Sequence, residues 1–202
     1  MDDQLIKSMK FYNRELSREI NLLSIGPFDI NVWYDQNRLR NIFKCLFLNN
    51  DTIFFSFKRE EDLTSDKELS QLRIKVFETF NKTGEYVFLK KLDEARFDSV
   101  ARIIVSGDST FDFLFDIWKY FYSCAFFVPV DGFTFSDYIS FHKKIKLQDK
   151  GGKKLLDKEY ANFECIKGLG GDSLLISYRK NYQLPDLMKA IADTPNINQC
   201  FR

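Results

Sequence analysis

The sequence predicts one α+β domain over residues 1–202, with a mostly antiparallel sheet of about six strands and amphipathic helices packed on one face. Three observations predict this class. The chain has 202 residues, of which 45% are hydrophobic, and this is enough apolar surface for a single well-packed core. Segments with a helical hydrophobic period alternate with segments of period two. Two strand-like segments near the C-terminus flank a glycine-rich turn, which is typical of an antiparallel hairpin.

The N-terminal third of the chain predicts the order helix, strand, helix, strand. Apolar residues in 5–23 recur at steps of three and four, which indicates an amphipathic helix that ends at Gly26-Pro27. Residues 28–34 alternate apolar and polar side chains and therefore predict a strand. An aspartate can cap a helix over 35–46, and the β-branched and aromatic residues of 52–57 predict the next strand.

The middle of the chain predicts further helices and strands. A capping box opens a predicted helix over 65–80, and residues 86–92 predict a strand. An aspartate cap followed by helical spacing predicts a helix over 93–104, and a broad apolar face predicts another over 111–122. Residues 124–130 predict a short buried strand. We expect that strand near a sheet edge because it contains a proline.

The C-terminal third predicts a polar loop and a hairpin. A serine cap opens a predicted helix over 136–144. The lysine-rich segment 143–158 is expected to be an exposed loop, because its charges and its glycine pair cannot be buried. Residues 160–166 and 173–178 predict the two strands of the hairpin, and Pro185 opens a predicted final helix.

The four cysteines, at positions 45, 124, 165 and 200, indicate a reducing compartment. Their spacing is too long and irregular for a CxxC motif, and most lie in apolar runs, so we expect free and mutually distant thiols. The first residues lack the basic and then apolar pattern of a secretory signal. No apolar run reaches the roughly 18 residues that a membrane-spanning helix needs. We therefore expect a cytoplasmic protein without membrane contact.

Few residue patterns favour catalysis. The single histidine, His142, excludes sites that need two imidazoles, and the two lysines after it predict a solvated surface residue. The cysteines lie in apolar patterns where an activated thiolate is not expected. Asp112 and Asp116 share one predicted helical face, for which solvated charge is the favoured interpretation. We therefore nominate no catalytic residue, no metal site and no cofactor, and the sequence leans away from an enzyme.

Aromatic residues are abundant, with 22 Phe, 9 Tyr and 2 Trp. Adjacent aromatic residues in one strand cannot both point inward, because neighbouring side chains alternate between the two faces. This conflict arises in predicted strands at Trp33-Tyr34, Phe54-Phe55 and Phe126-Phe127. Either these strands are covered on both faces or one face carries an aromatic interface, and we favour covered strands.

These features favour binding to another protein as the function. As a small α+β domain with mixed acidic and aromatic residues, the chain resembles in general terms the immunity and antitoxin proteins that neutralise bacterial toxins. The resemblance implies a non-enzymatic bacterial inhibitor whose partner is a protein such as a toxin. The expected partner-binding residues are Trp33, Tyr34, Glu60, Glu61 and Asp62.

A nucleic-acid-associated protein is the alternative function. In that case Lys150, Lys153 and Lys154 would contact phosphates, and Tyr160 and Phe163 would stack on bases. The net charge of +1 opposes this alternative, because binding to nucleic acid needs an excess of basic residues on at least one face. An enzyme of unrecognised type is the third alternative.

Overall fold

The computed structural model describes residues 10–15, 20–29, 31, 33–58, 71, 74, 77–78, 86–89, 97–121, 123–145, 160–167 and 172–187. The strands in this part are β1 (Lys10–Glu15), β2 (Ile20–Gly26), β3 (Thr52–Phe57), β4 (Tyr86–Phe88), β5 (Ser99–Ile104), β6 (Cys124–Pro129), β7 (Ala161–Lys167) and β8 (Leu174–Arg179). The helices with assigned bounds are α1 (Trp33–Phe47), α3 (Asp108–Tyr120) and α4 (Phe135–Ile145).

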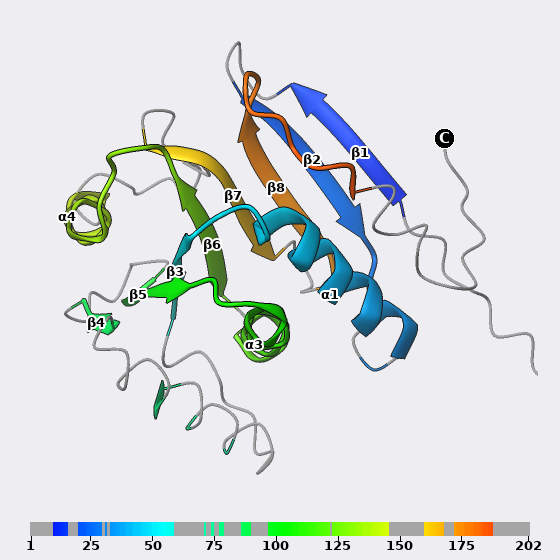
Figure 1. Cartoon of the computed structure of the whole chain (residues 1–202), viewed down its shortest axis with the longest axis horizontal. Helices are drawn as coiled ribbons and strands as arrows, with labels where there is room; N and C mark the ends of the chain where they lie inside the picture. The colour runs from blue at the N-terminus through cyan, green and yellow to red at the C-terminus, as the bar shows by residue number, and fades with distance from the viewer. Residues whose placement is uncertain are drawn as a thin grey trace, which may run out of the picture.

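The strands form one antiparallel sheet of eight, in the order β1-β2-β8-β7-β6-β3-β5-β4 (Figure 1). The predicted α+β class with a mostly antiparallel sheet is therefore confirmed. The sheet has more strands than the six or so expected, because two segments predicted as helices are strands. α1 and α3 share one face of the sheet, and the helical residue Phe77 packs against the same core. α4 packs on the opposite face, where no helix was expected.

The helix predicted over 5–23 is wrong. Part of this segment is β1 and β2, which pair from Lys10↔Gly26 to Glu15↔Asn21. β2 also pairs along six residues with β8, from Ile20↔Arg179 to Ile25↔Leu174. This second partner lies more than 140 residues along the chain. The pairing that makes the segment a strand is therefore not visible in its local hydrophobic period.

The strand predicted over 28–34 is also wrong. Phe28 follows β2 as a buried loop residue, and Trp33 and Tyr34 begin α1. Asp35 stabilises this start, because its Oδ2 accepts a hydrogen bond from the Asp29 backbone N–H at 2.7 Å. α1 therefore begins two residues before the predicted helix, and otherwise matches it. The conflict between Trp33 and Tyr34 across a strand does not arise.

Gly26 permits the close approach of β2 to the loop before β8. Its φ is +151°, which L side chains rarely adopt, and a Cβ there would lie 2.8 Å from the Cβ of Ser173. The Phe28 backbone N–H donates to the carbonyl of Asp172 in the same loop. The chain leaves the sheet at this point and enters α1.

The helix predicted over 93–104 is wrong in its second half, which is β5. Val100 and Ala101 are both fully buried, on opposite faces of the sheet. A strand that is apolar on both faces has no two-residue period, so its pattern cannot be distinguished from that of a buried helix. β5 is fixed instead by its pairing with β3 along its whole length and with the short β4.

Several local predictions are confirmed. β3 has the predicted bounds, α3 and α4 overlap the helices predicted over 111–122 and 136–144, and β7 and β8 pair antiparallel as the predicted hairpin. β6 is present but lies between β3 and β7, so the expectation of an edge position is wrong. Its Pro129 is tolerated at the strand end, where the register with β7 shifts.

Three further segments are described only in part. Of the helix predicted over 65–80, only positions 71, 74, 77 and 78 are described, and they are helical. In the predicted lysine-rich loop, 143–145 are the last residues of α4, and 146–158 lie outside the described residues. The final predicted helix is described only to Leu187.

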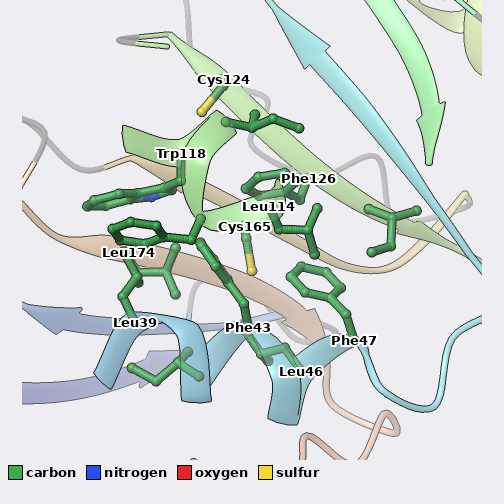
Figure 2. Packing of buried hydrophobic residues seen from close by; sticks show 14 of the residues in the cluster. Leu39, Phe43, Leu46, Phe47, Leu114, Trp118, Cys124, Phe126, Cys165 and Leu174 are labelled. Carbon is green, nitrogen blue, oxygen red and sulfur yellow. The ribbon is translucent and has the colours of Figure 1, made fainter. Parts of the chain in front are cut away.

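The main core lies between α1, α3 and the sheet. Figure 2 shows Phe43 and Phe47 extending from α1 toward Phe126 and Cys165 of the sheet. The ring centroid of Phe126 lies 5.5 Å from that of Phe43 and 5.8 Å from that of Phe47. Contacts of this geometry add to the hydrophobic stabilisation that burial of each ring provides.

Candidate interaction surface

The residues predicted to contact a partner are not brought together by the described part of the structure. Trp33 and Tyr34 are adjacent in the first turn of α1, and their side chains are not described. The acidic group Glu60, Glu61 and Asp62 lies outside the described residues, as do Lys150, Lys153 and Lys154. These assignments therefore stay predictions.

The paired aromatic residues of β3 and β6 are covered on both faces of the sheet. Phe55 and Phe126 are fully buried beneath α1 and α3. Phe54 and Phe127 are each 2% exposed and pack on the opposite face beneath α4. The preferred interpretation of covered strands is confirmed for these two pairs, which leaves no aromatic interface on either strand.

α4 is positioned by a reciprocal cap. The Thr134 backbone N–H donates to Asp137 Oδ2 at 2.9 Å, and the Asp137 backbone N–H donates to Thr134 Oγ1 at 3.2 Å. The Thr134 hydroxyl also donates to Asp137 Oδ2, and these bonds hold the pKa of the exposed Asp137 below its ordinary value. The cap is therefore Thr134 rather than the predicted Ser136, because a threonine with an acid three residues later satisfies both orphan amides.

One buried residue of α4 attaches the helix to the sheet. The Tyr138 side chain is 1% exposed, and its ring centroid lies 4.9 Å from that of Phe127 and 5.1 Å from that of Phe54. A ring of this size removes enough apolar area from water to hold α4 against the sheet.

Four aromatic side chains around Tyr138 remain only partly buried, and we call them the α4 aromatic cluster: Phe133, Phe135, Phe141 and Tyr160. Tyr160 stacks on Phe133 with centroids 4.9 Å apart and meets Phe141 edge-on at 5.6 Å. Phe135 lies 5.4 Å from Phe54.

The surroundings of the α4 aromatic cluster are acidic at one end. Asp131, two residues before Phe133, and Asp137 in the first turn of α4 are both exposed. Protein interfaces are typically built from aromatic side chains surrounded by a rim of polar residues. None of the residues in the α4 aromatic cluster was predicted to contact a protein partner, and Tyr160 was predicted only to stack on bases. The aromatic residues on both sides of the Thr134 cap are the signal that could have found them.

Polar groups are buried beneath α4. The Ser56 hydroxyl is fully buried and lies beside the Tyr138 hydroxyl, but its geometry falls short of a hydrogen bond. Burial raises the pKa of Tyr138 well above its ordinary value; the nearby Ser56 hydroxyl lowers it in part, and the charge of Glu164 raises it further. Tyr138 therefore stays protonated and cannot act as a base.

No disulfide joins the described cysteines Cys45, Cys124 and Cys165, and Cys45 and Cys165 resist ionisation. Burial raises the pKa of Cys165 far above its ordinary value, and the neighbouring Glu164 and Cys124 raise it further. Burial and the charge of Asp186 raise the pKa of the half-buried Cys45. Protonated thiols are poor nucleophiles. Cys124 and Cys165 face the same core from neighbouring strands, so the expectation that all thiols are mutually distant is wrong for this pair.

The other candidate groups have structural partners. His142 is half-buried rather than solvated, with its ring centroid 4.5 Å from that of Tyr138 in an edge-on contact. Asp112 lies on the solvated face of α3, as expected, and forms an ion pair with Arg40 at 3.1 Å. Within the described ranges, no group of three metal-ligating side chains gathers, and no helix is long and apolar enough to cross a membrane.

Comparisons with known proteins do not place the chain in a family. No family model matches it, and it matches no curated protein and no solved structure. The function is therefore inferred from the chemistry of the surface alone.

Proposed function

We propose that this protein is a non-enzymatic inhibitor of the immunity or antitoxin kind, which neutralises a partner protein by direct binding in a bacterial cytoplasm. The α4 aromatic cluster is the observation that carries the proposal. It places four partly buried aromatic side chains together, with exposed carboxylates at one end. Large aromatic anchors within a polar rim supply most of the binding energy of typical interfaces.

The chemistry of the described nucleophiles also favours a binding role. The raised thiol pKa values of Cys45 and Cys165 and the raised pKa of Tyr138 keep these groups neutral near pH 7. Catalytic nucleophiles and bases need a pKa that matches their task, which for a thiol means a lowered one.

The nucleic-acid alternative loses one of its two stacking residues. Phe163 is fully buried in the main core, with its ring 5.5 Å from that of Phe47, and cannot stack on a base. Tyr160 is engaged with Phe133 and Phe141. We therefore retain protein binding as the proposed function, with Trp33, Tyr34, Glu60, Glu61 and Asp62 as further proposed contacts.

The proposal is tested with the products of the genes that flank this reading frame in its genome. Each product is expressed alone and together with the chain, and both growth of the host and complex formation are measured. We expect one product to be toxic alone, to be neutralised by the chain, and to form a stoichiometric complex that survives about 0.5 M salt, because aromatic contacts are not screened. Absence of both rescue and complex for each neighbour would contradict the proposal.

Substitutions locate the contact within that complex. Phe133→Ala and Phe135→Ala should each weaken binding by about 2 kcal/mol if the α4 aromatic cluster is the anchor. Leu48→Ala is the matched control, since Leu48 is 55% exposed at the end of α1, on the other face of the sheet. Circular dichroism verifies that each variant is folded. If all three variants bind the partner with equal affinity, the interface is instead at the proposed contacts in α1 and at 60–62.

A further inference from the structure

We draw no further inference here: the strongest candidate, the outer edge of β1, is a regular six-residue strand edge for which nothing in the described part of the structure shows what covers it.

Discussion

The two faces of the sheet differ in chemistry although they are built from alternating residues of the same strands. On β3, Ile53, Phe55 and Phe57 face α1 and α3, whereas Phe54 and Ser56 face the other way. The pattern repeats on the neighbouring strands: Phe163, Cys165 and Ile176 belong to the first face, and Glu164, Ile166 and Ser177 point to the second.

The difference shows which face stabilises the fold and which face leaves side chains exposed. The first face forms one continuous, mostly apolar core with α1 and α3 over it. The second face is divided into smaller clusters and contains buried polar groups, and aromatic side chains at its margin stay partly exposed. A mostly apolar interior contributes most to folding, while an incompletely covered face leaves side chains available for a partner.

Truncation of a ring in the first face should have the largest effect. Phe126→Ala removes a fully buried ring that contacts Phe43, Phe47 and Phe55, and we expect a loss of about 3–5 kcal/mol in unfolding free energy. Phe133→Ala, in the partly exposed cluster, should cost only about 1 kcal/mol. Urea denaturation measures both. Equal losses would show that the α4 aromatic cluster is core rather than surface.

Removal of a buried charge on α1 should cause the second-largest loss of unfolding free energy. Asp35 and Arg38 form an ion pair at 2.8 Å, with side chains 10% and 5% exposed. Asp35→Ala leaves the Arg38 charge buried without its counter-ion, so we expect a loss of about 3 kcal/mol. The control is Lys44→Ala, which breaks the exposed pair with Asp108 and should cost under about 0.5 kcal/mol. A loss for Asp35→Ala as small as the control would mean that water reaches Arg38.

Each face contains a buried group that should make stability depend on alkaline pH. The pKa of Cys165 in the first face and that of Tyr138 in the second are raised in the folded state. Above about pH 9 the unfolded chain loses the thiol proton while the folded chain retains it, so stability falls as pH rises, by up to about 1.4 kcal/mol per unit for each group. Tyr138→Phe should remove the part of the decline that begins near the ordinary tyrosine pKa of about 10.

The measurement is urea denaturation from pH 7 to pH 11 for the natural chain, Tyr138→Phe and Cys165→Ala. Below pH 8 the slope of stability against pH should be the same in all three, because neither group titrates there in either state. A natural chain whose stability does not fall between pH 9 and pH 10 would show that the Cys165 thiol is solvated.

Substitution of two buried serines should change the unfolding free energy by small amounts of opposite sign. The Ser99 hydroxyl donates to Asp98 Oδ1 at 2.8 Å, and Ser99→Ala should cost about 1 kcal/mol. The Ser56 hydroxyl is buried without a hydrogen bond, so Ser56→Ala should be neutral or stabilising by up to about 1 kcal/mol. Thermal unfolding of both variants gives the comparison. A clear loss on Ser56→Ala would mean that the hydroxyl is satisfied beneath α4.

Parts of the fold could be predicted from the sequence, and their common property is a local signal. β3 has adjacent β-branched and aromatic residues between turn residues, and α1 has a carboxylate at its start. The β7–β8 hairpin has a glycine-rich turn between two strands. The interaction surface could not be predicted in the same way, because Tyr160 meets Phe133 only where the ends of β6 and β7 pair, and the Val130 backbone N–H donates there to the Tyr160 carbonyl.

By itself the sequence determined the class of the domain and the approximate positions of α1, α3 and α4. The tertiary structure decided that β1, β2 and β5 are strands, and that α4 covers the second face. The physical reason is that a strand gains its hydrogen bonds from distant segments, so a local period is ambiguous when both faces become buried. The side on which a helix packs is likewise set by the partner it finds, not by its own residues.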